Sequence, residues 1–166
     1  MASMTDPTDA LVSFQQALLD GEIRLQRGEL DPDIFVHTDK PTPDVVRITY
    51  VRLDGRTVKA FVNVISAGRV EGLPCFQLGV AVPVQYRNKG YAKSTLSSAI
   101  AELRNGLARN KIPSFYVEGV VSVDNEPSKR ASAATISPNP IPITDEVSGL
   151  PALHYIQKIE WGGDFK

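Results

Sequence analysis

Apolar residues near the start of the chain recur at the spacing of one helical face: Leu11, Phe14, Leu18 and Leu19. This spacing predicts an amphipathic helix that begins at Asp9 and ends at Gly21 or Gly28, since glycine commonly follows the last turn of a helix. Residues 1–8 show no periodic apolar pattern, and two methionines lie within the first four positions. We therefore expect a disordered or artificial tail over residues 1–8 and one folded domain over residues 9–166.

Two longer segments alternate in the manner of β-strands. Residues 45–53 and 57–65 are rich in β-branched residues and flank Asp54-Gly55, a favoured tight-turn pair, so they predict a long antiparallel hairpin. Further strands are predicted at residues 34–36, 75–82, 114–122 and 152–160. Pro83 ends the second of these because proline cannot donate a hydrogen bond to a neighbouring strand.

Helical spacing returns after Gly90. Its apolar face consists of Leu96, Ile100, Leu103 and Leu107, and the pattern ends at Asn110 and Pro113. A shorter helix is expected to begin at Asn125, since Pro127 suits the first turn of a helix. The order of these elements predicts an α+β fold, with a mixed, mostly antiparallel sheet and helices on both faces.

Composition and charge narrow the class of protein. A chain of 166 residues with 42% hydrophobic content suits a single domain, and its formal charge of −1 argues against an electrostatic nucleic-acid binder. No apolar run approaches the roughly 20 residues that span a bilayer. Cys75 is the lone cysteine, and with only His37 and His154 beside it a metal site has too few ligands. We expect a cytoplasmic protein without a metal, a membrane anchor or a nucleic-acid partner.

The junction between residues 75–82 and the helix after Gly90 is typical of an anion site. The first turn of a helix has unpaired backbone N–H groups and the positive end of the helix dipole, and a glycine there lets a ligand approach closely. Three basic side chains add positive charge: Arg87, Lys89 and Lys93. The alternative is an ordinary helix start with solvated basic residues.

Two well-known phosphate loops do not fit this junction. A P-loop that ends at Lys93-Ser94 requires glycine at positions 87 and 92, and a dinucleotide fingerprint requires three glycines where the chain has one. The remaining pattern is Arg87-x-x-Gly90-x-Ala92. It resembles the coenzyme A pyrophosphate motif of the GNAT superfamily of acyl-coenzyme A-dependent N-acyltransferases.

Flanking residues extend the resemblance over about residues 75–133. Val80-Ala81-Val82-Pro83 leads into the motif as the corresponding strand does in GNAT proteins. Downstream, Glu118, Asn125 and Ser128 are spaced as in the GNAT branch that includes ribosomal-protein N-terminal acetyltransferases. The resemblance implies a GNAT-like sheet with splayed central strands and acetyl-coenzyme A as the co-substrate.

The resemblance also implies which residues hold that co-substrate. The pantetheine arm is expected to pair with backbone groups of three strand residues: Val80, Ala81 and Val82. The pyrophosphate is expected to face the loop and first helical turn: Arg87, Asn88, Lys89, Gly90, Tyr91, Ala92 and Lys93. Asn125 is expected to hold the cofactor, to cap its helix, or both, and Ser128 is the other cofactor contact from that helix.

Acetyl transfer to an amine requires that the ammonium first lose a proton. The resemblance implies Glu118 as the base, with a pKa raised by burial; the alternative is a charge on the outer sheet face or one paired with a basic neighbour. Many GNAT enzymes use a tyrosine as the acid, but that position is Ser132 here. Ser128 or Tyr155 is left as the candidate acid, unless no protein acid is needed or Tyr155 only packs against the sheet.

The predicted function is an N-acetyltransferase that acts on a primary amine by direct attack. A small amine, an aminoglycoside-like molecule, a protein N-terminus and an aminoacyl-tRNA remain open as acceptors, as do a longer acyl group and a homodimer. The rival hypotheses are a non-catalytic acyl-coenzyme A-binding module and an interaction protein that retains only the fold. Residues 138–151, with four prolines, are expected to be stiff and non-helical. We expect them to form a wall of the acceptor site.

Overall fold

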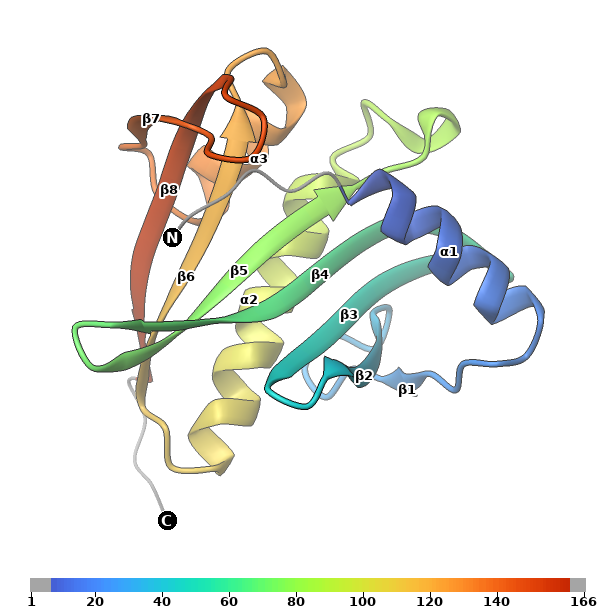
Figure 1. The fold of residues 1–166 in the computed structure, drawn as a ribbon. Helices are drawn as coiled ribbons and strands as arrows, with labels where there is room; N and C mark the ends of the chain where they lie inside the picture. The colour runs from blue at the N-terminus through green and yellow to red at the C-terminus, as the bar shows by residue number, and fades with distance from the viewer. Residues whose placement is uncertain (1–6, 162–166) are drawn as a thin grey trace.

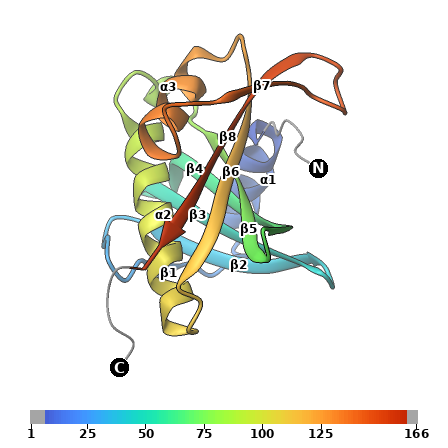
Figure 2. The ribbon, with the colours of Figure 1, turned by 90° about the vertical axis from the view of Figure 1, so that its left-hand side faces the viewer.

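The computed structural model describes residues 7–161, which form one eight-stranded sheet with a helix on one face and two helices on the other (Figures 1 and 2). In chain order the elements are α1 (Thr8–Leu19), β1 (Gln26–Arg27), β2 (Phe35–Thr42), β3 (Val45–Asp54), β4 (Thr57–Val70), β5 (Leu73–Ala81), a 3-10 turn (Val84–Tyr86), α2 (Tyr91–Arg109), β6 (Ser114–Ser122), α3 (Glu126–Thr135), β7 (Ile141–Thr144) and β8 (Pro151–Glu160). The predicted α+β class is confirmed. The predicted tail lies outside the described residues up to position 6, and α1 begins one residue earlier than expected.

The two faces of the sheet carry separate hydrophobic clusters. Leu11, Phe14 and Leu18 of α1 pack on one face against Val51 and Phe61. The larger cluster lies under α2 and α3 on the other face, and it includes Tyr50, Val62, Leu78, Leu96, Leu103, Phe115, Val117 and Tyr155. Because successive strand residues point to opposite faces, the alternation along β3 and β4 supplies both clusters.

The predicted hairpin is confirmed, but its turn lies one residue later than expected. Asp54 pairs with Thr57, so the turn residues are Gly55 and Arg56 and not Asp54 and Gly55. Gly55 has φ +61, a backbone conformation that glycine adopts at little cost. A register shift between Arg52 and Leu53 precedes the turn, and such a bulge is not visible in an alternation pattern.

Several strands differ from the expectation because their residues do not form a long alternating apolar pattern. The hairpin of β4 and β5 extends past the predicted ends to a tip at Glu71 and Gly72, where both φ angles are positive. The strands β1 and β7, and most of β2, were not predicted. Four residues of the proline segment pair with the outer edge of β8 as β7, an edge position that tolerates proline.

The central strands β5 and β6 separate at one end of the sheet (Figure 1). They run parallel and pair only at Cys75 with Tyr116, Phe76 with Val117 and Gln77 with Glu118. Beyond these pairs, β5 stays bonded to β4 and β6 stays bonded to β8. The facing edges over residues 78–81 and 119–122 therefore have no strand between them, which confirms the predicted splay.

Candidate active site

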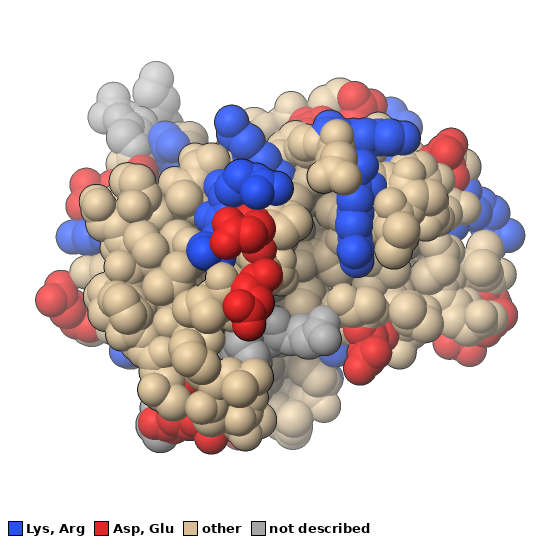
Figure 3. All heavy atoms as spheres, turned by 90° about the horizontal axis from the view of Figure 1, so that it is seen from above, with Lys and Arg blue, Asp and Glu red and all other residues tan. Residues whose placement is uncertain are grey.

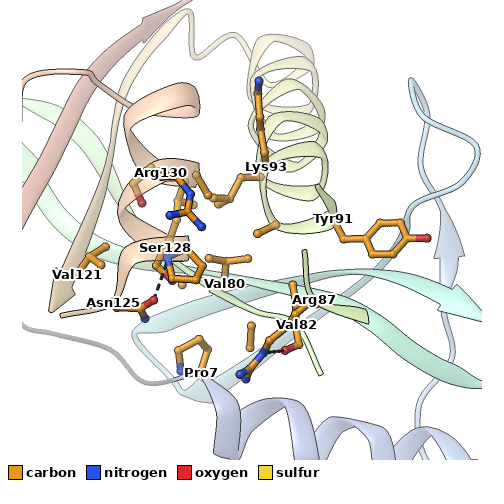
Figure 4. A pocket seen from close by; sticks show the side chains of 18 of the residues that line it. Pro7, Val80, Val82, Arg87, Tyr91, Lys93, Val121, Asn125, Ser128 and Arg130 are labelled. Carbon is orange, nitrogen blue, oxygen red and sulfur yellow. Dashed lines mark hydrogen bonds between the residues drawn. The ribbon is translucent and has the colours of Figure 1, made fainter. Parts of the chain in front are cut away.

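A cleft of about 1010 Å³ opens where β5 and β6 separate (Figure 4). Its walls come from six segments: the residues Pro7 and Thr8 at the start of α1, the end of β5, the loop after Pro83, the start of α2, the end of β6 and α3. Each of these segments except the start of α1 follows or precedes a strand end, so the sheet determines where these five lie. The cleft brings together most of the residues that the sequence assigned to a cofactor.

The loop before α2 presents unpaired backbone N–H groups to the cleft. The first amide bonded in the helical pattern is that of Ser94, which donates to the Gly90 carbonyl at 3.1 Å. The amides of Tyr91, Ala92 and Lys93 precede this bond, and these residues line the cleft. Gly90 has φ +79 and caps the helix without a side-chain hydrogen bond. Asn88, with φ +63, completes the sharp turn of the loop.

Arg87 ties this loop to the end of β5. Its Nε atom donates a hydrogen bond of 2.9 Å to the carbonyl oxygen of Val82 (Figure 4). Arginine has five N–H donors, and this bond uses one of them. The sequence predicted Arg87 as a phosphate ligand and did not predict this bond. The bond occupies the Val82 carbonyl, one of the backbone groups that the resemblance implied as partners of the pantetheine arm.

The opposite wall is the start of α3. Asn125 caps this helix, because its Oδ1 atom accepts a hydrogen bond of 3.2 Å from the Ser128 amide. The capping role of Asn125 is thereby confirmed, and both residues line the cleft. Arg130 lines it as well (Figure 4). Arg130 was not predicted from the sequence, although its spacing of three residues from Pro127 puts the two on one helical face.

Positive charge gathers around the mouth of the cleft. Arg87, Lys93 and Arg130 line it from three different segments, and Asp124 is the acidic residue among the lining side chains of the described chain. Figure 3 looks onto this end of the molecule and shows Lys and Arg on both sides of a hollow, with Asp and Glu on one side. Lys89, although in the same loop, is exposed and does not line the cleft. The arrangement suits an anionic ligand.

Glu118 lies at the point where the two strands part. It pairs with Gln77 in the last bonded position of β5 and β6, and it is 8% exposed. Its Oε2 atom is 2.8 Å from Nε2 of His154 on β8. Burial, with a smaller contribution from Glu118, raises the pKa of the neighbouring Cys75 thiol to about 11. A solvated charge on the outer sheet face is therefore excluded for Glu118, whereas pairing with a basic neighbour is observed.

The two candidate acids occupy different environments. Ser128 lines the cleft. Tyr155 is 2% exposed, packs in the hydrophobic cluster under the helices, and is not among the lining residues; burial raises its pKa. Ser132, at the position where many GNAT enzymes have a tyrosine, is buried and lines the cleft. The structure thus brings the two serines to the cleft and leaves Tyr155 in the core.

Two side chains of β7 point to the same face of the sheet as the side chain of Glu118. Ile141 pairs with His154, and His154 pairs with Val120 of β6. Paired residues point to the same face of a sheet, and so do residues two apart on one strand. Ile141 and Ile143 therefore lie on the face that carries Glu118 and His154. Ile141 is 54% exposed, which leaves apolar surface beside the pair.

We expect replacement of Ile141 and Ile143 by alanine to raise the KM for the acceptor on the order of tenfold, because the two changes remove apolar contact worth roughly two buried methylene groups. The affinity for acetyl-coenzyme A should stay the same. Steady-state kinetics and calorimetry measure the two quantities. Val147→Ala is the matched control, since Val147 is 82% exposed in the same hairpin but beyond β7. Unchanged acceptor kinetics with lost cofactor affinity or lost folding would remove β7 from the acceptor wall.

Among residues 7–161 no group of three or more His, Cys, Asp or Glu side chains is arranged to hold a metal ion. Within the same residues, no helix has the length and apolar character needed to cross a membrane.

No protein-family model and no curated protein matches the sequence. Solved structures match the fold. The acetyltransferase of the GNAT family from Streptococcus pneumoniae has a TM-score of 0.54 and 15% identity over 94% of this chain and 96% of that one. The putative acetyltransferase yncA from Salmonella typhimurium, determined with acetyl-coenzyme A, has a TM-score of 0.53 and 14% identity over 96% and 78%.

Ribosomal-protein-S5-alanine acetyltransferase from Vibrio fischeri has a TM-score of 0.52 and 12% identity over 74% of this chain. The match spans 64% of that protein, less than two thirds of its length. The chain has the fold of GNAT acetyltransferases, as the sequence resemblance implied.

Proposed function

We propose that the protein is an N-acetyltransferase that moves the acetyl group of acetyl-coenzyme A to a primary amine by direct attack. The observation that carries this proposal is the cleft between β5 and β6, which has an anion-binding loop on one wall and opens beside the last bonded pair of the two strands, where the Glu118 carboxylate is buried. A reaction that consumes acetyl-coenzyme A also fits the cytoplasmic location expected from the sequence.

The residues present suit coenzyme A in three respects. Its pyrophosphate is an anion, and the loop offers the amides of residues 91–93 with Arg87 and Lys93 beside them. Its pantetheine arm has amide groups that can add to an open strand edge, which β5 offers over residues 78–81. Asn125 and Ser128 line the opposite wall, and we assign them to this arm. We assign Asn88 and Gly90 to the phosphate end, where Gly90 permits the closest approach, and we assign no contact to Lys89 because it does not line the cleft.

The thioester of acetyl-coenzyme A supplies an activated acetyl carbonyl. The protein must supply a proton acceptor for the ammonium form of the amine, and we assign this role to Glu118 because it borders the apex of the cleft. We assign Ser128 to the departing thiolate as a hydrogen-bond donor. We assign no role as acid to Tyr155, because its side chain is buried and does not line the cleft.

The second candidate function is a non-catalytic module that binds acyl-coenzyme A. Ser132 stands where many GNAT enzymes have the tyrosine that protonates the thiolate, and this substitution favours the second candidate. The acceptor class is also a proposal. A protein N-terminus is one candidate, because the similar protein from Vibrio fischeri is named as an acetyltransferase of a ribosomal protein. A small amine is the other.

Thiol release with a panel of amines separates the two functions. The panel should contain small amines, aminoglycosides and peptides with a free N-terminus. We expect release of free thiol from acetyl-coenzyme A to depend on one class of amine and to be saturable. Binding of acetyl-coenzyme A without amine-dependent thiol release from any class would support the binding module and contradict the enzyme.

A further inference from the structure

A histidine outside the region of GNAT resemblance contacts the proposed base. His154 lies on β8, two positions from Ile156, which pairs with Glu118 across the strands. The 2.8 Å contact joins Nε2 of His154 to Oε2 of Glu118. The side chain of His154 is 18% exposed and that of Glu118 is 10% exposed. The contact is therefore shielded from bulk water, while part of the imidazole ring still reaches the surface.

The chemistry of the two groups fixes the direction of this hydrogen bond. An ionised carboxylate only accepts hydrogen bonds, and a neutral imidazole carries one N–H group. Beside an ionised carboxylate the imidazole therefore donates from Nε2, and in the neutral ring the Nδ1 atom then keeps the lone pair. A buried carboxylate needs such a donor, because burial of an unpaired charge is costly. Among the described residues, no fully buried side-chain N or O atom lacks a partner.

We propose that His154 is a positioning residue for acetyl transfer: its Nε2–H group holds one oxygen of Glu118 so that the other oxygen faces the incoming amine. The inference rests on the proposed function. It adds a residue that neither the cofactor motif nor the fold comparison assigns. Its physical basis is orientation, since a carboxylate that rotates freely spends little time aimed at the ammonium proton.

Acetyl transfer moves two protons and two electron pairs between named atoms. One proton of the ammonium moves to the free oxygen of Glu118, and the nitrogen lone pair then forms a C–N bond with the thioester carbonyl carbon. The C–S bond breaks and its electron pair leaves with the sulfur. A second nitrogen proton ends on the sulfur, which yields the amide and the free thiol. Glu118 returns its proton to solvent.

Other ionisable groups on this face do not replace His154. On β5, the Cys75 thiol has a pKa of about 11, raised mainly by burial. On β6, Tyr116 has its pKa raised mainly by the 2.9 Å hydrogen bond that it donates to Glu71. On β8, the Lys158 ammonium lies 3.2 Å from Glu160. The residues of β7 that share the face, Ile141 and Ile143, are apolar.

Two substitutions at position 154 test the positioning role by kinetics. His154→Leu removes the donor, and we expect kcat to fall by about 10- to 100-fold, the usual effect of losing a residue that orients a reactive group. His154→Gln keeps an N–H donor of similar reach and should recover most of the rate. The Kd for acetyl-coenzyme A should stay the same in both variants. His37→Gln is the matched control, since His37 is the other histidine and lies against Phe14 of α1.

Nitrogen NMR of the imidazole rings supplies a readout that needs no turnover. We expect the neutral His154 ring of the wild type to show a protonated Nε2 and an unprotonated Nδ1. The Glu118→Leu variant should also populate the other tautomer. His37→Gln assigns the signals. A protonated Nδ1 in the wild type, or a wild-type rate in His154→Leu, would overturn the inference. So would an equally slow His154→Gln variant, because it would indicate proton transfer through the ring.

Failure of the proposed function gives a different result. If the wild type releases no thiol with any amine while the Nε2–H tautomer is present, the pair exists but has no role in transfer. That outcome overturns the function first and the positioning role with it. Circular dichroism detects unfolding of a variant. If the His154→Leu and His37→Gln variants both lose rate and both unfold, a specific role of His154 is also contradicted.

Discussion

Gly90→Glu is expected to lower the affinity for acetyl-coenzyme A by at least about 100-fold, equivalent to about 2.7 kcal/mol. The new carboxylate would stand at the start of α2, where the loop amides and Arg87 favour an anion, so it would compete with the pyrophosphate and repel it. A Cβ atom at this position meets no other atom within 4 Å, so the fold has room for the side chain. Isothermal titration calorimetry measures the effect.

Gly90→Ala is the matched control for backbone strain. Gly90 has φ +79, a conformation that costs a non-glycine residue about 1–2 kcal/mol. Alanine introduces this strain without a charge, so it should lower stability but keep most of the affinity. Equal affinities in the wild type and a folded Gly90→Glu variant would show that the phosphate does not lie at this loop.

Glu118→Gln is expected to reduce turnover by about 100- to 10,000-fold, the usual effect of removing a general base. Glutamine has nearly the same shape, and its carbonyl oxygen can still accept the hydrogen bond from His154. Glu118 is not among the residues that line the cleft, so the Kd for acetyl-coenzyme A should stay the same.

Glu160→Gln is the control for this experiment, because Glu160 is an exposed acid on β8 that pairs only with Lys158 among the contacts described. It should leave kcat and the pH profile as they are. Wild-type turnover of Glu118→Gln at every pH would remove Glu118 from the mechanism and leave solvent as the proton acceptor.

Local signals in the sequence predicted the parts of the site that are contiguous in the chain. The cofactor loop was predicted because Arg87 and Gly90 lie within four positions of each other, between a strand end and a helix start. Asn125 was predicted as a possible cap because Pro127 suits the first turn of a helix that begins there, and the hydrogen bond from the Ser128 amide confirms the cap. Such features depend on neighbouring residues and hardly on the rest of the fold.

Contacts of side chains that depend on the register of strands distant in the sequence were not predicted. His154 reaches Glu118 across 36 positions of sequence, and only the register of β6 and β8 brings the two together. Tyr155 was considered for the cleft, but the same register turns it toward the helices, since residues adjacent on a strand face opposite ways. The pairing of β7 was missed because the prolines near Ile141 mask the alternation of a short edge strand.

A crystal structure with acetyl-coenzyme A tests the central claim most directly. The account predicts electron density for the pyrophosphate at the amides of residues 91–93 and for the pantetheine along the open edge of β5, with the acetyl group at the apex near Glu118. Density for the ligand at any other surface, or an unchanged and empty cleft in crystals grown at saturating acetyl-coenzyme A, would contradict it.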